Sequence, residues 1–413
     1  MRNWHVVICV LVATMSAAQD WQIFNMANAG FPSNTVQALA EDADGRIWAG
    51  TDWGLCAYHD GQWSVFQMST YDLPANDITA LAIDPDDALW IGTSLDGIVI
   101  WNVDDTTHLS TGNSLLPDNT INSITIDHRG WIWIGTPAGL ACITEDGWRI
   151  YNDTPDSWMG MQMFSPHVRD VIVREDDLAA VSTMNGGLTY ITDTAMVYHT
   201  SYNANFFDNS QNGIVFDSNG DRWIASLTAG LIRHAGPFNE TTWFNYDVFN
   251  TGLPDNTITA IVSDENDVKY AGTEIGGFII FQPDGSWTSF DPSDSPMPDY
   301  RVHDLMLSPD NSLWIATNEG GVVRYSLSTA IDGSANVDVS IFPSPFIDRL
   351  IISWPGASTF QWQVLDMQGR IAGTGSAQGE RTVIDLRSAP AGPLHMVLTN
   401  GSTRIGQKVV KIH

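Results

Sequence analysis

Two groups of side chains in this sequence could do chemistry: histidines beside acids, and closely spaced aspartates. His303 precedes Asp304 within the first strand of the seventh repeat, and His167 begins the equivalent strand of the fourth. A histidine oriented by a carboxylate can act as a general acid or base; the simpler interpretation is a histidine hydrogen-bonded to its neighbours. The sequence contains no G-x-S-x-G, H-E-x-x-H, phosphate-binding P-loop or paired C-x-x-C motif. No motif therefore assigns catalytic residues.

Asp217, Asn219 and Asp221 alternate within one turn. Oxygen ligands at alternate positions suit Ca²⁺. However, no Glu follows at the spacing of a bidentate ligand, and the same place in other repeats holds an Asp-, Asn- or Gly-rich turn that needs no metal. We therefore expect no cofactor and no metal site, with calcium at this turn as the alternative.

A repeat of 42 to 47 residues organises these side chains. Its clearest element is a four-residue strand end, typically Trp-Ile-Gly-Thr, which occurs seven times: Trp48–Thr51, Trp90–Thr93, Trp133–Thr136, Ala180–Thr183, Trp223–Ser226, Tyr270–Thr273 and Trp314–Thr317. A period of this length with four short strands per unit is typical of a β-propeller. We expect an all-β fold, a seven-bladed propeller whose first strands line a central channel.

Each repeated position has a physical reason. The Trp and the Gly of the strand end lie on one face, where Trp would fill the wedge between blades and Gly would leave room for the adjacent backbone. A further Gly follows each strand end, for example Gly97 and Gly321. We expect it to adopt a positive φ where the next hairpin closes.

The count of strands predicts how the ring closes. The seventh unit stops at Tyr325 without a fourth strand, whereas Trp21-Gln22-Ile23-Phe24 is a fourth strand that no unit precedes. Pairing the two would leave no open edge at the seam. We therefore expect residues 21–24 to form the outermost strand of the last blade.

Composition and charge divide the chain. Residues 1–18 resemble a secretory signal peptide, with Arg2, a short apolar run and small residues before Gln19. Residues 19–331 would form the propeller, 332–338 a linker, and 339–413 a small antiparallel β-sandwich. Residues 19–336 hold 43 Asp and Glu against 10 Lys and Arg, while residues 337–413 hold 5 against 7. This acidity argues against nucleic acid as a partner, and no stretch is long enough to span a membrane as a helix.

Cys56 and Cys142 are the cysteines that remain after residue 18. They belong to different repeats and different phases of their strands. Two buried free thiols are therefore expected rather than a disulfide.

The repeat unit Leu116-Pro117-Asp118-Asn119-Thr120-Ile121, followed by Trp133–Thr136 and Gly139-Leu140, resembles the two-component-regulator propeller repeat. Units one, two, three and six follow this pattern well, whereas unit four lacks its Trp and Gly. In that family such repeats often form the extracytoplasmic sensor of a hybrid histidine kinase that responds to glycans. No membrane span or kinase follows here, so we do not expect the signalling role.

The tail resembles the C-terminal sorting domain of type IX secretion cargo in the Bacteroidota. The resemblance rests on Phe342–Phe346, Val364–Arg370, Ile384–Leu386, Ala391-Gly392 and the basic end at Lys408 and Lys411. Ser344 and Leu394-His395 depart from the usual pattern. The resemblance implies a secreted or outer-surface protein that engages the type IX machinery through this domain, which is then removed.

Ligand candidates lie in the loops that follow each strand end and in the connections between blades. Exposed aromatic rings beside acids suit sugars, whose C–H faces stack on rings while carboxylates accept hydroxyl protons; alternatively, these rings pack between blades. The candidates are Asp52, Trp53, Asp96, Trp158, Asn185, Glu274, Tyr300, His303 and Glu319. We expect a non-enzymatic binding module for an extracellular glycan or protein. The alternative is an extracellular lyase or hydrolase acting at the channel mouth.

Overall fold

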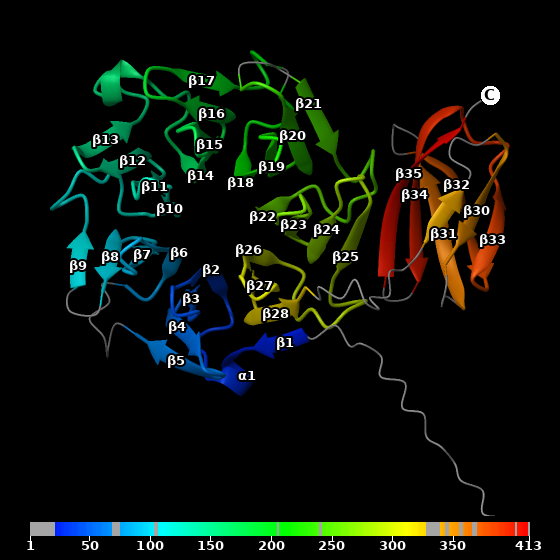
Figure 1. Ribbon diagram of the computed structural model, residues 1–413, viewed down its shortest axis with the longest axis horizontal. Helices are drawn as coiled ribbons and strands as arrows, with labels where there is room; N and C mark the ends of the chain where they lie inside the picture. Colours follow the sequence, from blue (N-terminus) through cyan, green and yellow to red (C-terminus); the bar gives the residue numbers. More distant parts are fainter. Residues whose placement is uncertain are drawn as a thin grey trace, which may run out of the picture.

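The computed structural model describes residues 21–67, 75–102, 106–204, 206–238, 242–327, 339–342, 347–354, 358–365, 370–400 and 403–411. The expected signal peptide and the linker at 332–338 lie outside these ranges. The described chain is nearly all β, and Figure 1 shows a ring of small sheets arranged about a common centre, with a second β domain beside it. Helical structure is confined to α1 (Met26–Ala29) and the 3₁₀ turn η1 (Trp158–Gly160) within the described ranges.

Seven four-stranded antiparallel units make the ring, as the fold-class prediction required. From the channel outward, the first three blades are formed by β2 (Val36–Glu41), β3 (Ile47–Thr51), β4 (Gly54–His59) and β5 (Gln62–Phe66); β6 (Ile78–Ile83), β7 (Leu89–Thr93), β8 (Ile98–Trp101) and β9 (Thr106–Leu109); and β10 (Ser123–Ile126), β11 (Ile132–Thr136), β12 (Gly139–Thr144) and β13 (Gly147–Tyr151). Blades four and five are formed by β14 (Val168–Val173), β15 (Ala179–Thr183), β16 (Leu188–Ile191) and β17 (Met196–His199); and β18 (Gln211–Phe216), β19 (Arg222–Ser226), β20 (Leu231–Ala235) and β21 (Thr242–Tyr246).

The last two blades complete the ring. Blade six contains β22 (Ile258–Ser263), β23 (Lys269–Thr273), β24 (Phe278–Phe281) and β25 (Trp287–Phe290). Blade seven contains β26 (Val302–Leu307), β27 (Ser312–Thr317) and β28 (Val322–Ser326), and its outermost strand is β1 (Trp21–Phe24). Trp21 lies opposite Tyr325 and Phe24 opposite Val322 in an antiparallel pair. The first and last strands of the propeller therefore share one blade.

Seven apolar clusters lie between consecutive blades, and each joins strands of two neighbours. The cluster between blades one and two contains Trp48, Leu55 and Ile78, and the cluster at the seam contains Phe31, Trp314 and Val322. The small residue of each strand end faces the next blade: a Cβ on Gly50 would lie 2.5 Å from Ile78 Cγ2. The small residue thus makes room for a β-branched side chain of the next blade. The sequence pattern had suggested that it makes room for the adjacent backbone.

The repeated polar residues hold the blade turns. In the turn before the Trp strand, one Asp oxygen accepts backbone N–H groups and the other accepts the Trp indole N–H. Asp127 Oδ2 to Trp133 Nε1 and Asp84 Oδ2 to Trp90 Nε1 are 3.0 and 2.9 Å. The later glycines have positive φ, as predicted. Only glycine fits at these positions, because a Cβ on Gly97 or Gly321 would meet the carbonyl oxygen of the fourth strand at 2.1 Å.

The second domain has its own core. It contains β29 (Ser340–Phe342), β30 (Arg349–Ser353), β31 (Thr359–Leu365), β32 (Ile371–Gln378), β33 (Arg381–Asp385), β34 (Gly392–Asn400) and β35 (Thr403–Lys411). One sheet has the order β29-β30-β33, and the other joins β32-β31-β34-β35. Leu350, Trp354, Phe360 and Met396 lie in the apolar cluster between them, so the arrangement is a small antiparallel sandwich.

Candidate functional site

One face of the ring, here called the loop face, carries the loops after each strand end together with the connections between blades. Backbone hydrogen bonds join the two sets: Asp52 N donates to Thr35 O at 3.2 Å, Glu274 N to Thr257 O at 3.1 Å and Asn318 N to Arg301 O at 3.2 Å. The Asn of the repeat fixes the longer connections, since Asn119 Oδ1 accepts Thr111 N and Asn256 Oδ1 accepts Val248 N, both at 2.8 Å. The backbone therefore holds the loop face in a defined shape.

Exposed apolar side chains of the propeller gather on the loop face. Trp53 is 60% exposed and Tyr300 is 45% exposed. The others on this face are Met26, Leu95, Leu115, Met159, Phe164, Tyr202, Phe207, Phe249 and Ile275. These side chains come from loops of most blades, so the exposed apolar residues of the propeller are concentrated on one face of the ring rather than on both.

The loop face is also acidic. Among its described residues Arg301 is the single Lys or Arg, and it forms an ion pair with Glu274 at 3.0 Å. The acids are Asp52, Asp77, Asp96, Asp118, Asp153, Asp156, Asp208, Asp247, Asp255, Glu274, Asp291, Asp294, Asp299 and Glu319. Several serve the loops themselves: Asp299 Oδ1 accepts Arg301 N at 3.2 Å, and Asp255 Oδ2 accepts Ile275 N at 2.9 Å.

The structure brings some of the sequence candidates together near blades six, seven and one. His303 lies in β26, where its Nδ1 is 3.0 Å from Val36 O of blade one. Burial lowers its pKa, and Arg301 lowers it further, while Val36, Asp299 and Asp52 oppose the shift. Asp52, Arg301 and His303 are thus electrostatic neighbours, and Glu274 joins them through its ion pair with Arg301. The sequence argument missed Arg301, which a search for basic residues on this acidic face would have found.

Other candidates lie apart from this group. Trp158 packs toward the outer side of blade three, with the Arg149 guanidinium 5.1 Å from its ring centre. Asn185 is exposed with φ 64°, and its N–H donates to Ser210 Oγ at 3.2 Å. Asp96 and Glu319 are exposed on the loops of blades two and seven. Of these residues, Trp158 has the contacts of a packing residue rather than of a ring open to a ligand.

His303 is hydrogen-bonded to a neighbouring backbone group, which was the simpler interpretation, and it does not pair with Asp304. Asp304 Oδ2 accepts Leu39 N from blade one, and its Oδ1 accepts Leu305 N, both at 2.8 Å. Both side chains reach blade one across the β-bulge at this point, and each binds backbone groups instead of the other. His167 also has a lowered pKa, mainly through burial and Arg169.

The channel holds a ring of polar residues that the repeat pattern did not reveal. Six of the seven first strands have one extra residue at a β-bulge near their start; β10 of blade three has a regular register. The residues at the seven equivalent positions are Gln37, Thr79, Asn122, Arg169, Asn212, Thr259 and His303. Most bind the next blade: Asn122 Nδ2 donates to Val168 O at 2.6 Å, and Asn212 Nδ2 to Ile258 O at 2.8 Å. This ring ties consecutive blades together around the channel.

Asp170 and Asp304 follow two of these bulges, in blades four and seven. Burial raises the pKa of Asp170 to about 7 and that of Asp304 to about 6, although two backbone N–H groups donate to each carboxyl. Asp304 also raises the pKa of Asp170. Perturbed carboxyls can mark functional sites, but here one oxygen of each carboxyl accepts an N–H of its own strand and the other accepts an N–H of the next blade.

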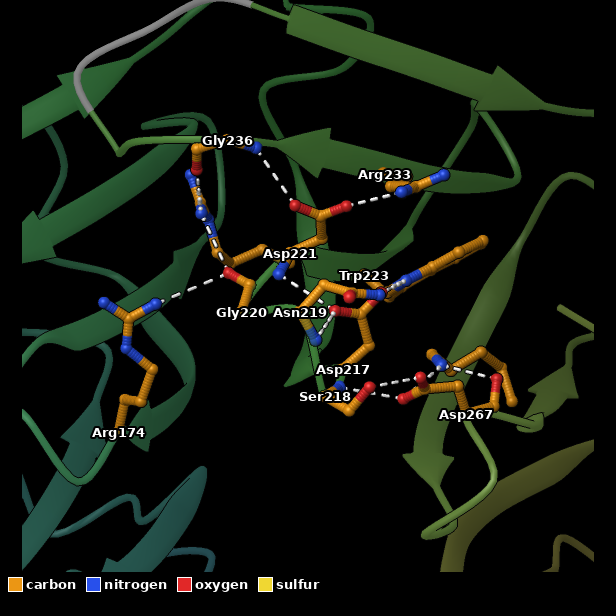
Figure 2. A network of polar contacts seen from close by, with 12 residues as sticks. Arg174, Asp217, Ser218, Asn219, Gly220, Asp221, Trp223, Arg233, Gly236 and Asp267 are labelled. Atoms are coloured by element: carbon orange, nitrogen blue, oxygen red, sulfur yellow. Dashed lines mark hydrogen bonds and ion pairs between the residues drawn. The ribbon is translucent and has the colours of Figure 1, made fainter.

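The turn proposed for calcium is filled by hydrogen bonds (Figure 2). Asp217 Oδ1 accepts Asn219 N and Asp221 N, and its Oδ2 accepts Trp223 Nε1, all at 3.0 Å. Asp221 accepts Gly236 N at 3.0 Å and forms an ion pair with Arg233. Within the described ranges, no three His, Cys, Asp or Glu side chains are grouped so as to hold a metal ion. Both cysteines are free and buried, as expected, and burial raises the pKa of each to about 12.

Comparison with known proteins agrees with this architecture. The family model for the two component regulator propeller matches residues 30–53, 72–94 and 115–138, in the first three repeats. The chain thus carries two-component-regulator propeller repeats, as the sequence resemblance indicated. No curated protein matches the chain. In the part of the chain that the structure describes, no helix has the length and apolar character needed to cross a membrane.

Solved structures share the fold at low identity. The extracellular domain of a putative hybrid two-component system from B. thetaiotaomicron matches with a TM-score of 0.67 and 17% identity over 95% of this chain and 57% of that chain. PorZ, described as an essential surface component of the type-IX secretion system of Porphyromonas gingivalis, matches with a TM-score of 0.55 and 16% identity over 94% of this chain and 60% of that one. The chain thus spans less than two thirds of either protein.

A virginiamycin B lyase from Staphylococcus aureus matches with a TM-score of 0.58 and 13% identity, over 75% of this chain and 99% of that chain. A lyase structure with one histidine replaced by alanine is described as catalytically inactive. An extracellular domain of a two-component system, a secretion-system component and an enzyme therefore share this fold, and the fold alone does not choose a function.

Proposed function

We propose that this chain is an exported or cell-surface propeller that binds an extracellular glycan or protein through its loop face. The observation that carries the proposal is the gathering of exposed aromatic and apolar side chains among acids on that one face. Rings such as Trp53 and Tyr300 can stack on the C–H face of a sugar or on an apolar side chain. The neighbouring carboxylates can accept hydrogen bonds from hydroxyl groups.

The extracellular location is supported by two of the structures that share the fold, the extracellular domain of a putative hybrid two-component system and a surface component of type IX secretion. The second domain forms a separate sandwich with its own core, which suits a removable sorting signal. We therefore include secretion by the type IX route in the proposal. This part is tested by expressing a chain that ends at residue 336 in a host with that machinery. Cell fractionation then measures where the shortened chain is located.

The binding proposal is tested by melting the full chain with a panel of glycans, with and without calcium. A ligand at ~100 times its Kd stabilises a protein by about 2.7 kcal/mol, which shifts the melting temperature measurably. For a ligand found in this way, Trp53→Ala should raise Kd at least tenfold. Phe244→Ala should not, because Phe244 is also exposed but lies in outer strand β21. Equal effects of the two variants would refute a site on the loop face.

An enzyme is the second candidate, and His303 is the observation that favours it. Its lowered pKa keeps the imidazole neutral near pH 7, so it can accept a proton. Asp52 and Arg301 lie near it on the loop face. The same glycan panel is therefore assayed for product, and turnover that His303→Ala abolishes while binding persists would replace the binding proposal with catalysis.

A further inference from the structure

The outer edge of blade six differs from the outer edges of the other blades. In six blades the fourth strand ends the sheet, whereas β25 continues into β35 of the second domain. Trp287 lies opposite Gly406, Thr288 opposite Ile405 and Ser289 opposite Arg404 in an antiparallel pair. Figure 1 shows the second domain standing against this edge. One eight-stranded sheet thus runs from the channel of the propeller into the second domain.

The residues of β25 suit a covered edge rather than a free one. Its sequence, Trp-Thr-Ser-Phe, contains no charge and no proline, which are the features that keep edge strands from pairing. Trp287, Ser289 and Phe290 are buried. By contrast, the outer strands β5, β9 and β21 each expose two or more side chains. An uncovered β25 would offer unpaired backbone groups to any extended strand.

A loop of the propeller fits against the second domain beside this strand pair. A Cβ on Gly252 would lie 2.8 Å from Val397 Cγ2 and 3.6 Å from His395 Cδ2. Gly252 has a φ of +70°, and its neighbour Thr251 accepts the Trp287 indole N–H through its carbonyl at 3.1 Å. The loop is therefore held in place by the propeller, and its shape is complementary to the surface of the second domain.

The second domain can present β35 without help from the propeller. Lys411 at the end of β35 donates from Nζ to the carbonyl oxygens of Leu386, Arg387 and Ala389 at 2.9, 2.9 and 2.6 Å. β35 also pairs with β34 along nine residues. β35 is thus held in place by its own domain. It can pair with the β25 edge of any copy of the propeller in the same register.

We propose that the edge of β25 is a strand-binding site, and that the C-terminal domain of a second copy of this chain can occupy it in place of the chain's own. Recognition through backbone hydrogen bonds makes no distinction between the two copies. The charges are complementary, because residues 19–336 carry a net −33 and residues 337–413 a net +2.

The experiment uses the full chain with a protease site placed at 332–338. Two populations with different tags on the propeller and on the C-terminal domain are cut and mixed. We expect the two parts of each chain to remain together on gel filtration, and tags to exchange between copies over hours. Separation of the parts upon cutting, or lasting association without any exchange, would overturn the proposal.

Two matched variants identify the interface. Gly252→Asn should raise the dissociation constant of the C-terminal domain at least tenfold, because its Cβ meets Val397. Gly285→Asn is the control: Gly285 lies between β24 and β25 of blade six and also has a positive φ, +85°, but nothing lies within 4 Å of its Cβ position. Asn tolerates this backbone conformation better than most residues, so both variants should fold. Equal dissociation constants would place the contact elsewhere and refute the site.

Discussion

The six residues at the β-bulges, and the equivalent Asn122 of blade three, show how unlike side chains can serve one purpose. An amide, a hydroxyl, a guanidinium and an imidazole occupy the same place in different blades, and most of them bind a polar group of the next blade. A bulge frees a residue from the ladder between strands, so that its side chain can turn to a neighbouring sheet. What this position requires is thus a polar group that can reach across, not a particular residue type.

The raised pKa of Asp170 predicts a pH dependence of stability. Its folded pKa of about 7 lies above the ordinary value of 3.8, so the folded state holds a proton that the unfolded chain has lost between these values. This carboxyl therefore makes the fold more stable as the pH falls from 7 to 5, by about 2 kcal/mol. In Asp170→Asn, urea unfolding at pH 7 and pH 5 should show that much less gain.

Buried histidines change the stability with pH in the opposite direction, so the experiment needs a control for them. The pKa of His199 and that of His303 are lowered by burial, so protonation of the unfolded chain costs stability as the pH falls below their ordinary value. The comparison is therefore between the slopes of wild type and variant, in which these histidine contributions cancel. Asp304→Asn should reduce the slope in the same direction, since its folded pKa is also raised. Parallel slopes for all three proteins would contradict this account.

At the scale of elements, β1 decides whether the ring is closed. Trp21 packs against Tyr325, Phe290 and Phe278 with ring centres 4.8, 5.7 and 5.9 Å apart. The strand therefore joins blade seven by hydrogen bonds and blade six by aromatic contacts. We predict that Trp21→Ala lowers the free energy of unfolding by about 3 kcal/mol, in the range for large core truncations.

Trp53→Ala provides the comparison, because Trp53 is also close to one end of the propeller sequence but is largely exposed. Substitutions of exposed residues usually change stability by less than about 0.5 kcal/mol. Chemical denaturation of both variants measures the difference. A loss in Trp21→Ala no larger than that in Trp53→Ala would mean that the seam adds little to the stability of the ring.

Much of the fold could be read from the sequence because its signals are local and repeated. The Trp strand end, the Asp turn before it and the Gly after it recur at fixed places, and each meets a steric or hydrogen-bonding need inside one blade or between two. Even the role of residues 21–24 follows from counting strands. Unit four, which lacks the Trp and the Gly, still forms β15 because Ala180 and Ser182 keep small side chains at a buried position.

The site was less predictable because it depends on contacts between distant segments. Arg301 meets Glu274 only after two blades pack side by side. Trp158 had the composition of a ligand-binding residue, yet Arg149 of the preceding strand covers its ring. The pairing of β25 with β35 joins residues more than a hundred positions apart, and no local pattern in either strand indicates its partner.

At the scale of the whole molecule, charge is the dominant feature. The chain carries a formal net charge of −30 at pH 7, and nearly all of it lies on the propeller. Part of this charge does structural work, since Asp42, Asp84, Asp127 and Asp217 each accept an indole N–H. The remaining acids repel one another across a compact ring, and such repulsion destabilises a folded state relative to an expanded chain.

Salt should therefore stabilise this protein, and most of the effect should come at low concentration. The distance over which charges act falls from about 30 Å at 0.01 M salt to about 8 Å at 0.15 M. We predict that the melting temperature rises by several degrees between these concentrations and more slowly above them. Sodium and potassium chloride should act alike if screening is the cause, whereas a bound cation would make the two salts differ. A melting temperature that does not change below 0.15 M would show that the ion pairs and turn hydrogen bonds already balance the repulsion.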